Sequence, residues 1–347
     1  MTRDSVYHEE SLMQYAQLLS LALIPLALGC QSSALTAAKL YLQQEEPQKA
    51  KDQLVLALET EPQNAEAHFL LGKIYSGEGD YAAMDASFAR AADLSPKFRS
   101  EIDQIRDFYW AREYNAGVKA AQGEEVDFDR ALTRFKNATL IRAGRLEAWR
   151  NLAYVYYQLD QYDRAIATYQ RIVAADSVDA NSLYSLGVLY ISQDRYQEAE
   201  QVLTQLSRIA PDHYDGHINL AVAQVRLEDL EGAEENYLKA IAIDPTRHSA
   251  HYNRGNLYWQ QQSYTAARKV YEQTLALAPD DDDALYNLAI THLALEDMEA
   301  AMPLLLQLSE RMPDNASVWR ELGRLYVLEG LLEESKAAYA KEEALAQ

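Results

Sequence analysis

The chain has 347 residues, with 53 Asp and Glu against 32 Lys and Arg, so its formal net charge is −21. A surface this anionic repels phosphate backbones, which argues against nucleic acid as a partner. The single cysteine, Cys30, excludes a disulfide within the chain.

The N-terminal segment 1–29 predicts an export signal. The run from Leu18 to Leu28 is apolar but shorter than the ~20 residues that span a bilayer, as in the apolar region of a signal peptide. Ala27-Leu28-Gly29-Cys30 resembles a bacterial lipoprotein box, in which the cysteine becomes the lipidated first residue of the mature protein. This resemblance implies attachment to a membrane by acyl chains, with Gln31 implying an outer-membrane lipoprotein that faces the periplasm. A structural thiol is the alternative role for Cys30.

A 34-residue period runs through the rest of the chain. Pro211, Pro245, Pro279 and Pro313 lie at this spacing, and a second series keeps step with them. A fixed period of this length indicates stacked supersecondary units rather than one globular core. The second series is Ala199, Ala233, Ala267 and Ala301, and nine units begin near residues 31, 65, 112, 146, 180, 214, 248, 282 and 316.

Each unit predicts two helices joined by a tight turn. In the unit that ends at Pro279, Tyr252, Gly255 and Tyr258 have helical spacing, residues 261–263 break the pattern, and a second helical pattern starts at Tyr264. A Gly or Ala recurs early in the first helix, where a missing side chain allows two helix axes to approach closely. Proline closes most units because it disfavours helix in the residue before it.

In chain order, residues 31–98 hold the first two units, 99–145 the third and 146–347 units four to nine, with a capping helix at the C-terminal end. The interval from Pro96 to Pro211 is longer than three periods, and residues 102–122 keep helical spacing. We therefore expect an extended first helix in the third unit. A bend is expected there, because Ala143 and Ser177 replace the closing prolines, and Pro303 predicts a kink.

These units resemble the tetratricopeptide repeat family. The family signature appears in the fifth unit as Leu183, Leu186, Gly187, Tyr190, Ala199, Leu203, Leu206 and Pro211. The resemblance implies an all-α, right-handed superhelical solenoid of about nine helix-turn-helix repeats. It also implies that the protein binds proteins or peptides.

Catalytic motifs are absent from the sequence, which has no Gly-rich phosphate loop, no Gly-x-Ser-x-Gly and no His-Glu-x-x-His. We therefore expect no enzymatic activity and no cofactor. His213, His217, His248 and His251 have spacings that a metal site could use. Because His217 and His251 occupy the repeat position of Trp149, Leu183, Leu285 and Trp319, packing explains them and we expect no metal.

The resemblance implies that the first helices line a concave face, into which positions 2, 5, 6, 9, 12 and 13 of each unit point. Amides dominate there together with aromatics, which supply apolar area, and an amide can pair with one peptide unit of an extended partner. The alternative is that these side chains only stabilise the stack. The candidate groove residues are Arg150, Asn151, Tyr154, Tyr157, Tyr184, Asn219, Tyr252, Asn253, Asn256, Trp259, Tyr286 and Asn287.

Four of the candidates, Asn151, Asn219, Asn253 and Asn287, share one repeat position and resemble the asparagine ladder of O-linked N-acetylglucosamine transferase, which holds peptide backbone. The sequence thus predicts a non-catalytic scaffold, anchored in the cell envelope, that binds peptides or partner proteins. A peptidoglycan-binding or other glycan-binding adaptor is one alternative, because aromatic grooves also stack on sugars. The recognition subunit of a separate glycosyltransferase is another.

Overall fold

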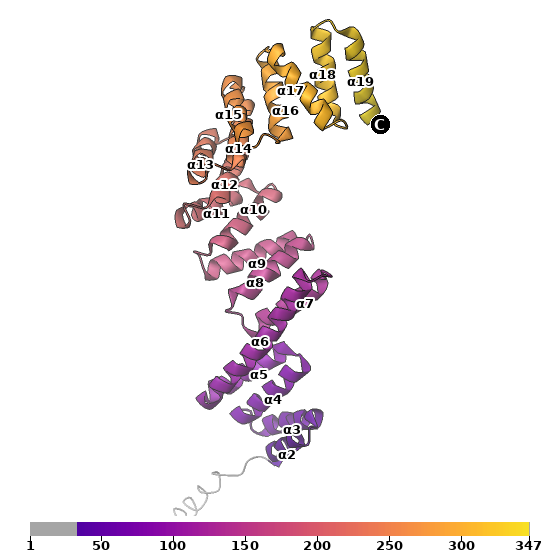
Figure 1. The fold of residues 1–347 in the computed structure, drawn as a ribbon. Helices are drawn as coiled ribbons and strands as arrows, with labels where there is room; N and C mark the ends of the chain where they lie inside the picture. The colour runs from indigo at the N-terminus through magenta and orange to yellow at the C-terminus, as the bar shows by residue number, and fades with distance from the viewer. Residues whose placement is uncertain (1–32, 347) are drawn as a thin grey trace, which may run out of the picture. The chain divides into compact units, whose positions relative to one another are not determined.

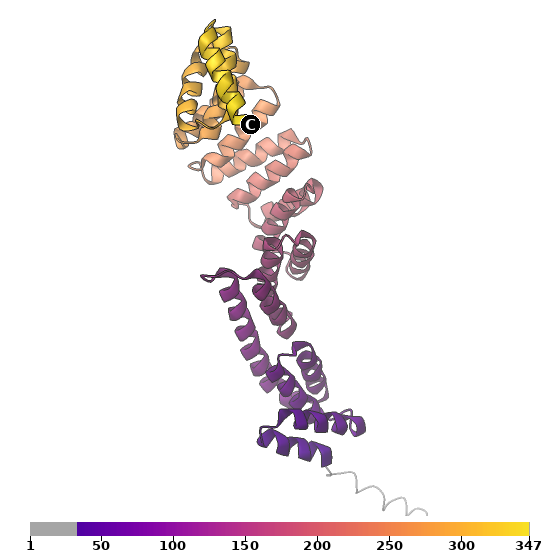
Figure 2. The ribbon, with the colours of Figure 1, turned by 90° about the vertical axis from the view of Figure 1, so that its right-hand side faces the viewer.

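The computed structural model describes residues 33–346. Within this range the chain forms eighteen α-helices, one short 3-10 helix and no strand (Figures 1 and 2). The predicted all-α class is therefore confirmed. The predicted signal segment 1–29 and the candidate lipidation site Cys30 lie outside the described residues.

The helices belong to two compact units that divide between Leu159 and Asp160. The first unit contains α2 (Ser33–Gln43), α3 (Pro47–Thr60), α4 (Ala65–Glu78), α5 (Tyr81–Leu94), the 3-10 helix η1 (Pro96–Phe98), α6 (Arg99–Gln122), α7 (Phe128–Ile141) and α8 (Leu146–Gln158).

The second unit contains α9 (Tyr162–Ala175), α10 (Ala180–Ser192), α11 (Tyr196–Ile209), α12 (Tyr214–Arg226), α13 (Leu230–Ile243), α14 (His248–Gln260), α15 (Tyr264–Leu277), α16 (Asp282–Ala294), α17 (Met298–Arg311), α18 (Ala316–Leu328) and α19 (Leu332–Ala346). Eight of the nine predicted helix pairs lie within one unit, and the division separates α8 from α9. The bend expected near residues 102–122 stays a prediction.

Local chemistry sets the helix ends. The Asp281 carboxylate accepts a hydrogen bond from the Ala284 backbone N–H (2.9 Å), which caps α16. The turn between the two helices of a repeat passes through a left-handed residue such as Asp194 (φ 55°) or Glu296 (φ 60°). Asp is among the non-glycine residues that adopt this conformation most often, and one left-handed residue is enough to close each pair tightly.

A glycine in the first helix faces a bulky side chain of the second helix in the same repeat. A Cβ on Gly72 would lie 2.4 Å from Phe88 Cδ1, and one on Gly255 would lie 2.6 Å from Tyr271 Cε1. The interval in sequence from the glycine to its bulky partner is the same in both pairs. The ring therefore occupies the space that a side chain at the glycine position would fill. This supports the expectation that small residues allow the two helices of a repeat to pack closely.

The third repeat departs from this spacing. Gly117 faces Phe135, and the interval between them in sequence is longer than in the other two pairs. If the third repeat began at residue 112, the glycine of its first helix would be expected later in the sequence than Gly117. The first helix of this repeat, α6, has 24 residues, whereas the other first helices have 11 to 14. The additional residues precede the part of α6 that pairs with α7.

Candidate functional site

The twelve candidate groove residues are divided between the two units. Arg150, Asn151, Tyr154 and Tyr157 lie on α8 of the first unit, and the other eight lie on α10, α12, α14 and α16 of the second. Each set is described within its own unit.

In the first unit, Asn151 joins two first helices. Its side-chain N–H groups donate to the Tyr114 hydroxyl on α6 (3.1 Å) and to the Glu147 carbonyl (3.1 Å). Tyr154 packs edge-on against Phe128 of α7, with ring centroids 6.4 Å apart, and is 41% exposed. The Asn151 donors are thus used inside the fold, while the tyrosine ring remains accessible.

The second unit repeats this pairing of a tyrosine with an asparagine one repeat further on. The Asn287 amide on α16 donates to the Tyr252 hydroxyl on α14 (3.2 Å), and Asn219 on α12 hydrogen-bonds Tyr184 on α10. In both pairs the asparagine follows its tyrosine at the same interval, one repeat and one position. These bonds tie successive first helices together, as the stack-stabilising interpretation predicts.

Asn253 on α14 is the exception to this pairing. The residue at the equivalent interval before it is Ile218, which has no polar side-chain atom. Asn253 is half-buried, and it has no hydrogen-bond partner in the part of the chain that the structure describes. Its complete side-chain amide, both donor and acceptor, therefore remains available to a ligand.

The neighbours of Asn253 on the same helix are held in place. The Asn256 carbonyl oxygen accepts hydrogen bonds from the Tyr271 hydroxyl (2.7 Å) and from the Asn287 amide (3.0 Å). Trp259 packs against Tyr264, with ring centroids 4.9 Å apart. The free amide thus lies on a helix on which Asn256 and Trp259 are held by contacts within the fold.

Two of the candidate tyrosines, Tyr184 and Tyr286, have raised pKa values and are neutral at physiological pH. Burial raises the pKa of Tyr184, and the nearby Asp215 carboxylate raises it further. Burial also raises the pKa of Tyr286, as does the carboxylate of Glu321. These phenols offer hydrogen bonds and apolar area without charge.

The four histidines singled out by spacing make separate contacts. His213 Nδ1 caps α12 by accepting from the Gly216 N–H (2.9 Å), and His217 Nδ1 lies 2.8 Å from Asn236 Oδ1. His248 pairs with Asp281 (3.1 Å), while burial lowers the pKa of His251. Among residues 33–346, no group of three His, Cys, Asp or Glu side chains is placed to hold a metal ion.

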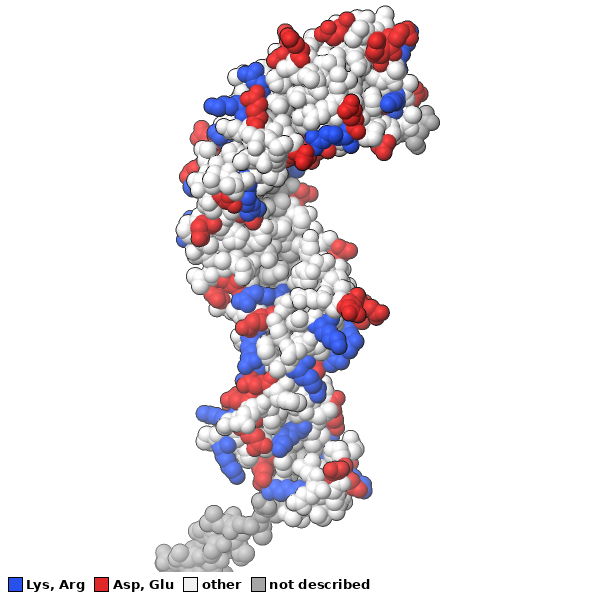
Figure 3. Space-filling view, viewed as in Figure 1, with Lys and Arg blue, Asp and Glu red and all other residues white. Residues whose placement is uncertain are grey.

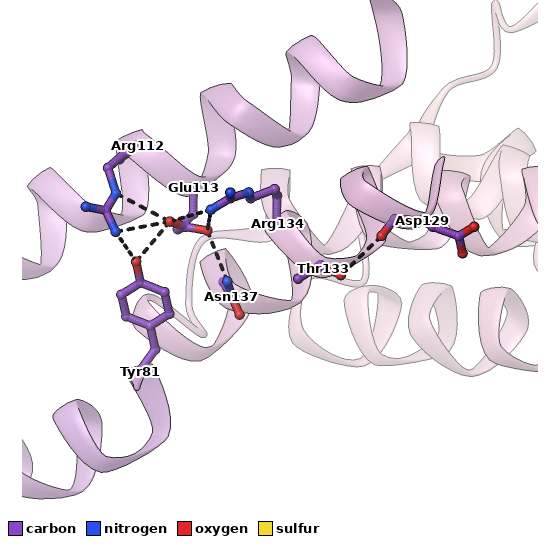
Figure 4. A network of polar contacts seen from close by, with 7 residues as sticks. All are labelled: Tyr81, Arg112, Glu113, Asp129, Thr133, Arg134 and Asn137. Carbon is purple, nitrogen blue, oxygen red and sulfur yellow. Dashed lines mark hydrogen bonds and ion pairs between the residues drawn. The ribbon is translucent and has the colours of Figure 1, made fainter. Parts of the chain in front are cut away.

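A buried carboxylate that sequence reasoning missed lies in the first unit (Figure 4). Glu113 on α6 is 1% exposed and accepts hydrogen bonds from Tyr81 (2.9 Å), Arg134 (2.9 and 3.2 Å) and Asn137 (3.0 Å). Arg112 adds longer contacts to the same carboxylate and a hydrogen bond to the Tyr81 hydroxyl. The network joins α5, α6 and α7.

Burial and hydrogen bonding oppose each other at Glu113. Burial raises its pKa, but the bonds from Asn137, Arg134 and Tyr81 outweigh burial, so the pKa is lowered overall. Burial and the hydrogen bond to Glu113 raise the pKa of Tyr81 to about 12. Glu113 is therefore ionised and Tyr81 neutral at pH 7, which fits a structural role.

None of the helices within residues 33–346 combines the length and the apolar character needed to cross a bilayer. The space-filling view shows side chains of both charge signs over each of the two units (Figure 3). Residues 160–347 contain 15 Lys and Arg against 31 Asp and Glu, a net charge of −16.

Comparisons with known proteins match this architecture. Tetratricopeptide repeat models match residues 65–98, 144–212 and 258–325, and a TPR repeat model matches residues 225–262. Together these matches cover more than half of the chain. No curated protein sequence matches it.

Two solved structures show the same fold. A tetratricopeptide repeat protein from Parabacteroides merdae is 15% identical with a TM-score of 0.53, and the match covers 70% of this chain and 94% of that one. The Pseudomonas aeruginosa protein pilF is 22% identical with a TM-score of 0.50, covering 60% of this chain and 94% of that one. The helix pairs, the glycine packing and the matching repeat models together show that the chain belongs to the tetratricopeptide repeat family.

Proposed function

We propose that the protein is a scaffold that binds an extended segment of a partner protein along the first helices of its second unit. The observation that carries this proposal is the unpaired amide of Asn253. It stands beside Tyr252 on a helix whose other candidate residues are already fixed by contacts within the fold. A side-chain amide can donate to one peptide group and accept from the same group.

The composition of the face supports a peptide ligand. Tyr184, Tyr252, Trp259 and Tyr286 are half-buried, so each presents part of a ring. Held aromatic rings contribute contact area at low entropic cost, because they lose little freedom on binding. Repeat proteins of this family generally work as platforms for proteins or peptides, which supports the same proposal.

Site-specific photo-crosslinking in cells tests this function. A photoreactive amino acid at position 253 is expected to form a covalent adduct with a partner protein. Position 235, on the second helix α13, is the matched control, because the Glu235 side chain is 67% exposed and bonds only Lys239 in the described structure. Equal adducts at both positions, or none at position 253, would reject the proposal.

We further propose that this scaffold is held at a membrane of the cell envelope through a lipid on Cys30. The lipoprotein-box resemblance of residues 27–30 supports this anchor. In the same cells, Cys30→Ser is expected to move the protein from the membrane fraction to the soluble fraction. Unchanged membrane association of the Cys30→Ser protein would rule the anchor out, without bearing on the peptide-binding face.

A further inference from the structure

We propose that the turn between α18 and α19 is a second docking surface, which binds an apolar segment of another protein flanked by Lys or Arg. Val327, Leu328, Leu331 and Leu332 form this apolar tip. They are 48, 55, 41 and 61% exposed, respectively. Four large apolar side chains close together at one turn are therefore left in water, which is unfavourable unless another surface covers them.

Two of the four residues are apolar where the same turn of other repeats is polar or small. The position of Leu328 is held elsewhere in the second unit by Ser192, Arg226, Gln260 and Ala294. The position of Leu331 is held by Arg195, Asp229, Ser263 and Asp297. The exposed leucines are thus a departure of this one turn from the repeat pattern.

Leu331 also occupies a position where a polar side chain stabilises the fold. Its N–H donates to the Tyr326 carbonyl (2.8 Å) and its carbonyl accepts from the Ser335 N–H (3.0 Å). Asp297 makes the same two backbone bonds before α17, and its carboxylate also caps that helix by accepting from the Ala300 N–H (3.2 Å). Leucine cannot make the capping bond.

All eight other second helices have a polar N-cap residue, and in four of them, Asp80, Asp127, Asp229 and Asp297, its side chain accepts a capping hydrogen bond. The other four are Glu46, Gln161, Arg195 and Ser263. At Leu331 a helix cap is missing and an apolar side chain is exposed at the same residue. Both features reduce the stability of the free protein. Such local conflicts with folding are expected at functional sites.

The charges around the apolar tip indicate which kind of partner segment would bind there. Glu329, Glu333 and Glu334 flank the leucines, and Glu333 is 84% exposed although Lys336 lies 2.8 Å from its carboxylate. Acidic side chains stand out at the end of the molecule where α18 and α19 lie (Figures 1 and 3). A second copy would bring the same acids against these, and an anionic bilayer would be repelled, so a basic partner segment is the complementary one.

Binding of a designed probe tests this surface. The probe is a fluorescein-labelled helical peptide of Leu and Lys, with one apolar stripe and lysines on both sides, and the full-length protein is titrated against it. Replacing both tip leucines, Leu328→Gln with Leu331→Asp, is expected to weaken binding at least tenfold. A peptide with Glu in place of Lys is expected to bind the unchanged protein at least tenfold more weakly.

The paired substitution distinguishes a loss of peptide binding at the tip from a loss of stability and from an effect of charge. Leu331→Asp restores the cap that Asp297 provides elsewhere, so the melting temperature is expected to rise while binding falls. The added negative charge would by itself strengthen binding of a lysine peptide. Asn253→Ala is expected to leave this binding unchanged, so failure here is distinct from failure of the peptide-binding face.

Three results would overturn the inference. Equal binding of the Leu and Lys peptide to the unchanged and substituted proteins would show that the tip is not the site. Dimers in sedimentation that the paired substitution dissociates would identify a second copy as the occupant. Flotation with phosphatidylcholine vesicles that the same substitution abolishes would identify a lipid surface.

Discussion

Replacing Arg134 by methionine is expected to destabilise the first unit by about 3 kcal/mol, because it removes a charged donor that contacts both oxygens of a buried carboxylate. Arg134 contacts both oxygens of Glu113, whose side chain is 1% exposed. Hydrogen exchange of α6 and α7 in the full-length protein measures the loss as faster exchange. Unchanged exchange would show that the contacts of Arg134 with Glu113 contribute little.

Glu113→Gln is the matched control, and it is expected to cost less, about 1 to 2 kcal/mol. The side chains of Arg112 and Arg134 are 48 and 37% exposed, so water solvates them when the carboxylate is removed. When Arg134 is removed instead, water cannot solvate the Glu113 carboxylate in the same way, because it is buried. If hydrogen exchange were faster in the Glu113→Gln protein than in the Arg134→Met protein, the unpaired buried charge would not be the main cause of the destabilisation.

The same network predicts how the first unit responds to acid. The pKa of Glu113 is lower in the folded protein than in the unfolded chain, so its contribution to stability is complete above the unfolded pKa of about 4.3. That contribution is lost as the pH falls through the folded pKa. In the Arg134→Met protein the folded pKa of Glu113 rises, and the loss begins at a higher pH.

Gly72→Ala is expected to destabilise the second repeat by about 2 kcal/mol, although alanine favours helix. The new methyl group would lie 2.4 Å from both Cδ1 and Cε1 of Phe88, a fully buried ring. That ring is packed among Phe69, Tyr81, Met84, Ala91, Ile102 and Ile141, so it cannot move away without disturbing its neighbours. Urea unfolding followed by circular dichroism measures the effect.

Gly77 provides the control on the same helix, α4. A Cβ there would meet no atom within 4 Å, so Gly77→Ala is expected to stabilise the helix by about 1 kcal/mol. Combining Gly72→Ala with Phe88→Leu is expected to cost less than the sum of the two single changes, because leucine leaves room for the methyl group. Strict additivity would contradict the fit between the glycine and the ring.

The helix pairs were predictable because one side-chain pattern recurs with a fixed period along the chain. The pattern that ends at Pro279 predicted helices on both sides of residues 261–263, and α14 and α15 lie there. The register of the third repeat was not predictable, because Gly117 and Phe135 lie further apart in sequence than the equivalent pairs of other repeats. The division at Leu159 and Asp160 has no signal of its own in the sequence.

The positions of the candidate site residues in the repeat were predictable from the sequence, but their hydrogen-bond partners were not predicted. Asn219, Asn253 and Asn287 are equivalent in sequence, yet their environments differ because Tyr184 and Tyr252 supply hydroxyls and Ile218 does not. Comparing each asparagine with the residue one repeat and one position before it would have shown this difference. Glu113 had no such signal, because a glutamate in a helix is usually solvated and its partners come from residues 81, 134 and 137.

We propose that the paired asparagines stabilise the second unit, whereas the unpaired Asn253 binds the ligand. The direct test compares Asn253→Ala with Asn287→Ala in two measurements, the melting temperature and the affinity for a peptide selected on the wild-type protein from a random phage library. Asn287→Ala is expected to lower the melting temperature, with a loss of about 1 to 2 kcal/mol. Asn253→Ala is expected to weaken peptide binding about tenfold at an unchanged melting temperature. Full binding by the Asn253→Ala protein, or equal destabilisation by both substitutions, would contradict the claim.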